Sequence, residues 1–421
     1  MWSVEMSLTA TVQKCSKMVN FLKVNSETAM DSNNNSEKYP NGYSNGSISQ
    51  VEYQESVTEV KKTTMPTFEE LRQAIPPQCF EKDLALSLFY LVLDYVILGA
   101  LYAIVPFVED FGGWTGLILW YYFVGMFGMS LFVVGHDCGH GTFSNYTWIN
   151  DICGHIAHSP LLAPYWPWQK SHRQHHTHTG NLEKDRGHAW VTEERYNELD
   201  FFRRHFRKIP FSGLFLWQTY TMLGLPDGSH FYPFSALYDN ATKKERIQCV
   251  VSALSCLFCA VIAFVLCDYN WFLYVKYYYV PLLFYGLWLV MITYLQHQDE
   301  EIEVYENGNW NYVKGQSQTI DRRYGFGIDT LTHHITDCHV VHHFFFTKIP
   351  HYHLPEATRA IKKIMTAYPG MYKSQTNYDY LFQFLRMNVH LDYLVGKGTG
   401  LLKYRVSKTF QNGQPLSKKN Q

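Results

Sequence analysis

Three groups of closely spaced histidines are the residues best suited to chemistry in this sequence. His136 and His140 form an HxxxH motif, and two HxxHH motifs follow at residues 172–176 and 339–343. On a helix, residues three or four positions apart share a face, so each motif can offer two or three imidazoles to one metal ion. Because a tetrahedral zinc site needs only four ligands, eight histidines indicate two metals. Imidazole suits iron, zinc and copper about equally, so ligand type alone does not identify the metal. The eight candidate ligands are His136, His140, His172, His175, His176, His339, His342 and His343.

Four apolar segments are long enough to position these motifs at a membrane. About 20 apolar residues cross the hydrocarbon layer, which is roughly 30 Å thick. The connections at 109–114 and 268–270 are short, so the segments form two hairpins. The predicted fold is all-α and integral to the membrane, with two transmembrane hairpins and a helical cap that carries the histidines. Asp94 falls inside the first span, where a charge should face a protein partner or a water pocket. The predicted spans lie near 84–108, 115–135, 248–267 and 271–296.

The distribution of charge predicts the orientation of the hairpins. With two hairpins, the N-terminus, residues 136–247 and the C-terminal region lie on one side of the membrane. Lys276 is the only lysine or arginine inside either hairpin, so the positive-inside rule places the histidine side in the cytosol. Two further apolar stretches, 156–165 and 210–225, are too short or too interrupted to span. They are predicted to be interfacial or re-entrant helices.

His297 is a candidate for a ninth ligand. It follows the fourth span at the cytosolic boundary, as His136 follows the second span. A single boundary histidine is normally an ordinary interfacial residue, but this symmetric placement favours a ligand.

The other histidines are weaker candidates. His333 and His334 flank the third motif and could orient its ligands. Asp137, Asp185 and Asp337 could accept hydrogen bonds from ligand imidazoles, or could equally be solvated carboxylates. Five histidines near the second motif are predicted to be mostly surface or supporting residues, namely His155, His158, His178, His188 and His205. Four more have no partner spacing, namely His230, His351, His353 and His390.

The remaining features define the domain limits and exclude some functions. Residues 1–65 are predicted to be a disordered cytosolic tail, 66–405 the main domain and 406–421 a second cytosolic tail. Thr67 and Glu70 form a capping box that opens a short helix, either interfacial or packed on the protein surface. The net charge of −1 gives no field that would recruit nucleic acid. The nine cysteines show no disulfide or zinc-finger spacing.

Two other classes of membrane metalloprotein fit the motifs less well. A transporter should place its ligands within the spans near the midplane, whereas these histidines lie beyond the span ends. A zinc-dependent hydrolase should hold an acid–base carboxylate beside the metal, as HExxH does, and the sequence has no such motif.

Several longer strings resemble one enzyme family. Three of them contain the histidine motifs, namely VGHDCGHGTFS, PWQKSHRQHHTHTG and HHITDCHVVHHFFFTKIPHYHLPEAT, and the strings GLPDGSHFYPFSALY and TYLQHQ agree with them. The chain resembles the membrane fatty acid desaturases over residues 66–405, and within them the methyl-end (Δ12/ω3) acyl desaturases. It looks most like the invertebrate Δ12 (oleate) enzymes.

This resemblance implies two non-haem irons, held by the eight motif histidines and His297. It also implies O₂ as co-substrate and electrons from cytochrome b5 and its NADH-dependent reductase. Some relatives carry a fused cytochrome b5 domain with an HPGG motif, which this sequence lacks, so the donor should be a separate protein. A related acyl-CoA desaturase group has an asparagine that holds a metal-bound water where this chain has Thr293, which puts that water in doubt.

The expected reaction is insertion of a cis double bond into an oleoyl-type chain to give a linoleoyl-type chain. An unactivated methylene has no acidic proton and no leaving group, so its C–H bond calls for oxygen activated at iron. An ω3 enzyme, a bifunctional Δ12/ω3 enzyme or an acyl hydroxylase would share every motif. The sequence leaves open whether coenzyme A or a phospholipid carries the acyl chain. The ending Lys418-Lys419-Asn420-Gln421 resembles a dilysine signal of the endoplasmic reticulum, which is the expected location.

Overall fold

The computed structural model describes residues 65–406, except residues 189, 207, 210–211 and 225. The two predicted tails, including the Lys418-Lys419 pair, therefore lie outside the described residues apart from Met65 and Val406.

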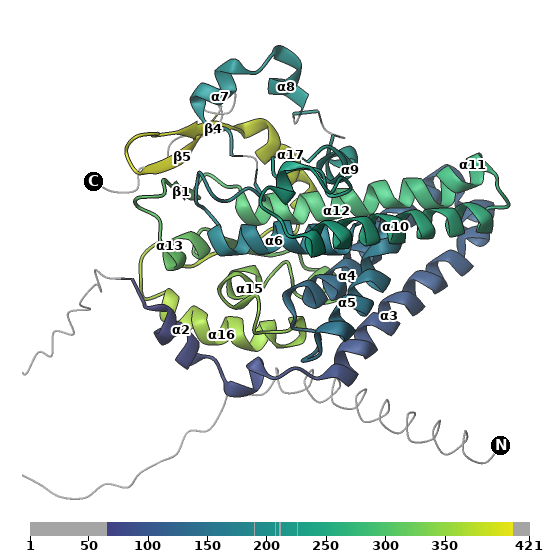
Figure 1. The fold of residues 1–421 in the computed structure, drawn as a ribbon, viewed down its shortest axis with the longest axis horizontal. Coiled ribbons are helices and arrows are strands. Elements are labelled where there is room, and N and C mark those ends of the chain that lie inside the picture. The colour runs from purple at the N-terminus through teal and green to yellow at the C-terminus, as the bar shows by residue number, and fades with distance from the viewer. Residues whose placement is uncertain (1–64, 189, 207, 210–211, 225, 407–421) are drawn as a thin grey trace, which may run out of the picture. The chain divides into compact units, whose positions relative to one another are not determined.

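Among the described residues, four helical segments are long and apolar enough to cross a membrane, which confirms the predicted number of spans (Figure 1). The second segment, Val105–His140, is kinked at Gly113 inside the predicted turn, where the φ of 53° is one that glycine adopts without strain. The second helix also runs five residues past the predicted end of its span, so the first histidine motif forms its last turns. The segments are α3 (Leu84–Ala103), α4 (Val105–His140), α10 (Lys243–Leu266), and α11 (Trp271–Tyr274) continued through the π-helix η4 (Val275–Tyr279) into α12 (Val280–His297).

The two hairpins are joined at the ends that lie far from the histidines. Glu109, near the turn between α3 and α4, forms an ion pair with Lys276 of η4. The hydroxyl of Tyr277 donates a hydrogen bond of 2.9 Å to the same carboxylate. The C-terminal ends of α4 and α12 consequently meet at the opposite end of the bundle, where His140 and His297 lie.

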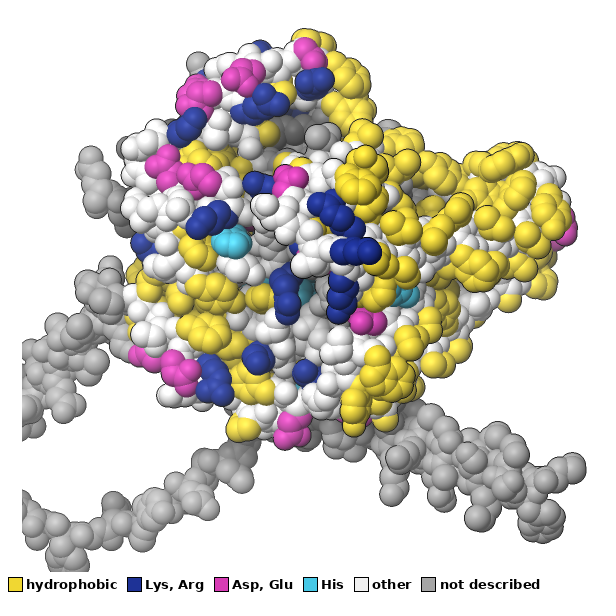
Figure 2. Space-filling view, in the orientation of Figure 1, with side chains coloured by type: hydrophobic (Ala, Val, Ile, Leu, Met, Phe, Trp, Pro, Cys, Tyr) yellow, Lys and Arg dark blue, Asp and Glu magenta, His cyan; other side chains and the backbone are white. Residues whose placement is uncertain are grey.

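The four long helices divide into an inner and an outer pair. The buried share of the most apolar stretch differs between the helices. It is 78% in α4 and 56% in the α11–α12 segment, but only 17% in α3 and in α10. The outer pair exposes large apolar side chains such as Val96 and Phe258, and Figure 2 shows them covering the arm formed by α3, α10 and α11. So large an apolar surface indicates a membrane protein.

The remaining helices pack around the histidine end of the bundle. The larger ones are α5 (Thr147–His158), α6 (Tyr165–His178), α9 (Gly213–Leu223), α15 (His339–Phe345), α16 (Leu354–Met365) and α17 (Tyr380–His390). The shorter ones are α2 (Phe68–Ala74), η1 (Pro77–Phe80), η2 (Ser159–Leu161), α7 (Glu193–Glu198), α8 (Phe201–Phe206), η3 (Ala236–Tyr238), α13 (Tyr312–Gln316), α14 (Ile328–Leu331) and η5 (His351–His353).

Three sequence predictions about local helices can be compared with this arrangement. The capping box of Thr67 and Glu70 is confirmed, and Leu71 of α2 is fully buried in the core cluster shared with α15 and α16, so α2 is a packed helix. The prediction of one helix over 156–165 is wrong, because α5 ends at His158 and α6 begins only at Tyr165, with prolines interrupting the segment between them. The stretch 210–225 does contain a helix, α9.

The prediction of an all-α fold needs correction, because five short strands accompany the helices in the described part of the chain. An antiparallel sheet has the order β1 (Glu303–Tyr305), β5 (Leu401–Val406), β4 (Leu391–Val395), and β2 (Ile320–Arg323) pairs in parallel with β3 (Lys373–Thr376). Strands of three to six residues are too short to give a clear alternating pattern. They matter for the site, because the Asp321 carboxylate on β2 accepts a 2.7 Å hydrogen bond from the backbone N–H of Val340 in α15.

Candidate metal centre

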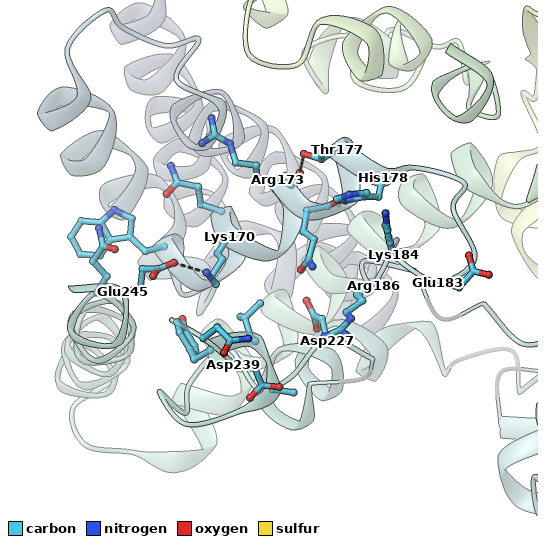
Figure 3. A pocket seen from close by; sticks show the side chains of 18 residues that line it. Lys170, Arg173, Thr177, His178, Glu183, Lys184, Arg186, Asp227, Asp239 and Glu245 are labelled. Carbon is cyan, nitrogen blue, oxygen red and sulfur yellow. Dashed lines mark hydrogen bonds and ion pairs between the residues drawn. The ribbon is translucent and has the colours of Figure 1, made fainter. Parts of the chain in front are cut away.

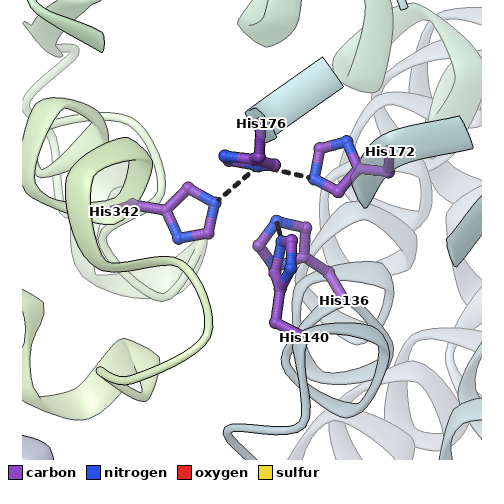
Figure 4. Close-up of side chains that lie close together, drawn as sticks. All are labelled: His136, His140, His172, His176 and His342. Atoms are coloured by element: carbon purple, nitrogen blue, oxygen red, sulfur yellow. Dashed lines mark hydrogen bonds between the residues drawn. The ribbon is translucent and has the colours of Figure 1, made fainter. Parts of the chain in front are cut away.

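Five histidines form a first group, to which α4, α6 and α15 all contribute. Figure 4 shows their rings turned toward one centre, and one nitrogen of each lies within 4.8 Å of the others. Nε2 of His176 lies 3.0 Å from Nε2 of His172 and 3.2 Å from that of His342. Two nitrogens bound to one metal at about 2.1 Å and at right angles lie about 3 Å apart. The spacing of the first group is therefore that of metal ligands. Its members are His136, His140, His172, His176 and His342.

A second group of histidines lies against the first. His175, His297 and His343 bring their nitrogens within 4.8 Å of one another. His339 joins them, since its Nε2 is 2.9 Å from Nε2 of His297. The structure thus gathers all nine predicted histidines, including the lone His297.

Each HxxHH motif divides its adjacent histidines between the groups. His175 and His176 go to different groups, and so do His342 and His343. Neighbouring residues on a helix with 3.6 residues per turn point about 100° apart, so the two rings cannot face the same centre. Each HxxHH motif therefore gives two imidazoles to one group, within the two or three predicted for one metal, and its third imidazole to the other group.

Hydrogen bonds from outside the motifs orient the second group. Nδ1 of His175 lies 2.8 Å from a carboxylate oxygen of Asp185, as predicted. Nδ1 of His343 lies 3.0 Å from the side-chain oxygen of Gln316, which the sequence analysis missed. These contacts assign the ring proton to Nδ1, and the Nε2 atoms of both histidines are buried without a hydrogen-bond partner among the described residues. A buried nitrogen lone pair without a partner fits a metal ligand.

The other two predicted carboxylate acceptors differ from Asp185. Asp137 lies 3.6 Å from Nδ1 of His136 and accepts a 2.9 Å hydrogen bond from His351 instead. The prediction for Asp337 is wrong, because that carboxylate pairs with His334 at 3.0 Å, outside both groups.

Burial keeps the imidazoles neutral. It lowers the pKa of His172, His176, His342 and His343 well below the usual 6.5, and neighbouring histidines lower the pKa further. Uncharged rings keep the lone pair that a metal requires. The orphaned nitrogens, their spacing and their neutrality together fit a site for two metal cations.

Two further residues mentioned in the sequence analysis have clear positions. Asp94 does face a protein partner, as predicted, because its carboxylate lies 2.8 Å from Nε2 of His333. His188 was grouped with mostly surface or supporting histidines, yet it is buried beside the second group, with its ring centre 4.7 Å from that of His297. Burial and then His175 lower the pKa of His188 to about 4. It sits in a loop, so no helical spacing marked it.

An apolar cavity of about 370 Å³ opens directly onto the histidines. Side chains from three helices line it, among them Phe132 of α4, Trp217 of α9 and Leu289 of α12. Thr293 also lines it. Six histidines form its polar end, namely His136, His172, His175, His188, His297 and His339. The cavity can hold an apolar chain against the candidate metal centre.

A polar pocket of about 900 Å³ lies on the other face of α6 (Figure 3). Its lining carries both signs of charge, with Lys170 of α6 paired to Glu245 of α10. His178 of α6 lines this pocket (Figure 3) and belongs to neither histidine group. The charged lining suits polar ligands, so an apolar chain belongs in the smaller cavity.

Comparisons with known proteins agree with this geometry. The family model described as "Fatty acid desaturase" matches residues 112–376, which contain both histidine groups. The chain belongs to the fatty acid desaturase family. As a member of this family it is an oxidoreductase that acts on fatty acyl chains, and the resemblance inferred from the sequence motifs is confirmed.

Three relatives show how far the similarity extends. The chain is 55% identical over 350 residues to the Delta(12) fatty acid desaturase fat-2 of Caenorhabditis elegans, covering 82% of this chain and 93% of the relative. It is 49% identical over 359 residues to the omega-3 fatty acid desaturase fat-1 of the same organism, covering 84% and 88%. An omega-3 fatty acid desaturase, endoplasmic reticulum, of Nicotiana tabacum is 35% identical over 334 residues, covering 77% and 84%. This desaturase therefore aligns with methyl-end enzymes over most of its length.

Proposed function

We propose that this desaturase inserts a cis double bond at the Δ12 position of an oleoyl-type chain to give a linoleoyl-type chain. The reaction removes one hydrogen from each of two adjacent carbons and reduces O₂ to two waters, with two electrons and two protons from outside. The observation that carries the proposal is the apolar cavity ending on both histidine groups. The 55% identity to a named Δ12 enzyme favours this position over ω3.

The nine histidines are proposed to hold two iron ions, one for each group. The converging nitrogens support this assignment, since the Nε2 atoms of His175 and His343 would otherwise be buried without partners among the described residues. Iron would supply the reduction of O₂ and the oxidising strength that an unactivated methylene requires. The residues proposed as ligands are His136, His140, His172, His175, His176, His297, His339, His342 and His343.

The protein's own side chains position the substrate and exclude water. Phe132, Trp217 and Leu289 offer the acyl chain an apolar surface, so the chain can leave the membrane interior for the cavity without exposing its methylenes to water. The carbon that lies nearest the histidines is then set by the depth of the cavity. Holding the chain in one position is worth several kcal/mol of the barrier in well-oriented reactions.

The proposed setting is the membrane of the endoplasmic reticulum. The residues 66–405 would form the catalytic domain, with both termini and the histidines in the cytosol. The absence of basic residues other than Lys276 from the hairpins supports this orientation, and the plant relative named for the endoplasmic reticulum supports the location. Cytochrome b5, reduced by its NADH-dependent reductase, is the proposed electron donor, and the acyl carrier is a phospholipid or coenzyme A.

Expression in a yeast that makes only monounsaturated fatty acids tests the proposal. Gas chromatography should show 18:2 formed from endogenous 18:1. If only supplied 18:2 is converted, to 18:3, the chain is an ω3 desaturase, which is the second candidate because of the 49% identical omega-3 relative.

Metal analysis separates these enzymes from a zinc hydrolase. The purified protein should contain close to two irons per chain. About one zinc and no iron would contradict desaturation of any regiospecificity.

A further inference from the structure

The two histidine groups are unequal in size. The first group has five members, whereas the second has four, namely His175, His297, His339 and His343. We infer that His188 is the fifth histidine of the second group and supplies a tenth nitrogen to the metal centre. This inference rests on the proposed function, because it concerns the metal held by the second group.

The His188 ring lies beside two members of the second group, His297 and His175, at distances similar to those between the members themselves. Its ring centre lies 4.7 Å from that of His297 and 5.4 Å from that of His175. For comparison, the ring centres of His175 and His297 are 4.7 Å apart, and those of His175 and His343 are 5.2 Å apart. The distances between ring centres therefore do not distinguish His188 from His175 and His343.

The nitrogens of His188 are arranged like those of the proposed ligands. Its Nδ1 lies 3.3 Å from the carbonyl oxygen of Gly187, which assigns the ring proton to Nδ1. Its Nε2 is buried and has no hydrogen-bond partner among the described residues. His175 and His343 show the same pattern, with Nδ1 held by an acceptor and Nε2 left over.

An unpartnered buried nitrogen is not sufficient by itself. Nδ1 of His158 is also buried without a partner in the described part of the chain. The rings around His158, however, are those of Phe132, Tyr165 and Trp168, which offer no other metal ligand. His188 differs because the ring that carries its unpartnered nitrogen lies beside two histidines of the second group, His175 and His297.

The loop before His188 is built around the second group. Asp185 accepts hydrogen bonds from His175 and from the backbone N–H of Gly180, which fixes the start of the loop. A Cβ on Gly187 would lie 2.6 Å from Cβ of His175, so only glycine lets the loop lie this close to α6. His188 follows at once and forms part of the cavity wall with His297 and Thr293.

Anaerobic iron titration of the full-length protein in detergent tests the inference. Metal-free wild type should bind two Fe²⁺ per chain. His188→Ala should bind the first with unchanged affinity and the second at least tenfold more weakly. X-ray absorption should show a lower average number of nitrogen neighbours per iron in the variant when both sites are loaded.

Two controls separate a ligand from a merely structural residue. His178→Ala removes a histidine of α6 that lines the polar pocket and belongs to neither histidine group, so it should titrate like wild type. Adding free imidazole to His188→Ala should restore the second affinity, because the small molecule can enter the space left by the ring. A fold defect would weaken both irons and would not respond to imidazole.

The outcomes are distinct. Unchanged binding of the second iron by His188→Ala would overturn the inference, and so would a weakened second site that imidazole fails to restore. Wild type that binds fewer than two irons would instead contradict the proposed function and, with it, the inference.

Discussion

The two histidine groups reach similar geometry by different means. The first group takes two pairs at i, i+4 from single helices, His136 with His140 on α4 and His172 with His176 on α6. The second group takes one such pair, His339 with His343 on α15, and single histidines from α6 and α12. It also depends on outside residues such as Asp185 and Gln316 for orientation. Helix periodicity positions most of the first group, whereas tertiary hydrogen bonds contribute more to the second.

This difference predicts how each group responds to substitution. The first should fail only when a ligand itself is lost. The second should also be sensitive to the residues that hold its Nδ1 atoms, because metal-bound histidines depend on such partners for ring orientation.

Loss of a ligand in the first group should have the largest effect. His172→Ala removes a ring whose Nε2 lies 3.0 Å from that of His176, so the first metal should not be held. We expect no detectable product by gas chromatography in yeast, with the protein still present in the membrane fraction. Retained activity would refute the assignment of His172 as a ligand.

Removal of the carboxylate behind His175 should have the next largest effect. Asp185→Asn leaves the ring without a negative acceptor, and we expect about a 10- to 100-fold loss of activity and weaker binding of the second iron. Asp337→Asn is the matched control, because Asp337 pairs with His334 outside both groups. The comparison fails if both variants lose activity equally.

A smaller effect is expected at Gln316. Its oxygen accepts from Nδ1 of His343, but the hydroxyl oxygen of Thr179 lies 3.2 Å from the same nitrogen and offers a second acceptor. Gln316→Met should therefore reduce turnover by less than tenfold, and the double variant with Thr179→Val should fall toward the level of Asp185→Asn. Steady-state turnover of the purified variants with a fixed electron donor measures this. Equal rates for the single and double variants would show that Thr179 does not compensate.

The same contrast explains what the sequence could predict. HxxxH and HxxHH spacing is local, and the apolar runs are long, so eight of the nine histidines and the four spans could be read directly, whereas His297 was inferred from its place after the fourth span. Helix geometry alone implies that His175 and His176 face different directions. That His175 belongs to a second group can be recognised only once the fold brings that group together. Gln316 and His188 lie at no helical spacing from any motif, and the short strands that anchor α15 pair residues about fifty positions apart. Their roles arise only when the chain is folded.

The smallest effect should be one in which the two groups behave alike, since burial is common to both. The pKa of His342 in the first group and of His343 in the second is lowered well below 6.5 in the folded protein. Below pH 6.5 the unfolded chain therefore binds protons that the folded chain does not, so stability is present above pH 6.5 and is lost as pH falls. Each such histidine makes the free energy of unfolding of the metal-free protein fall by about 1.4 kcal/mol per pH unit.

His342→Gln and His343→Gln should each reduce that slope by the same amount, measured by denaturant unfolding in detergent between pH 7 and 5.5. A reduction confined to one variant would show that the two groups differ in burial as well as in the hydrogen bonds that orient their rings. The different sensitivity of the groups to substitution could then not be attributed to Asp185 and Gln316 alone.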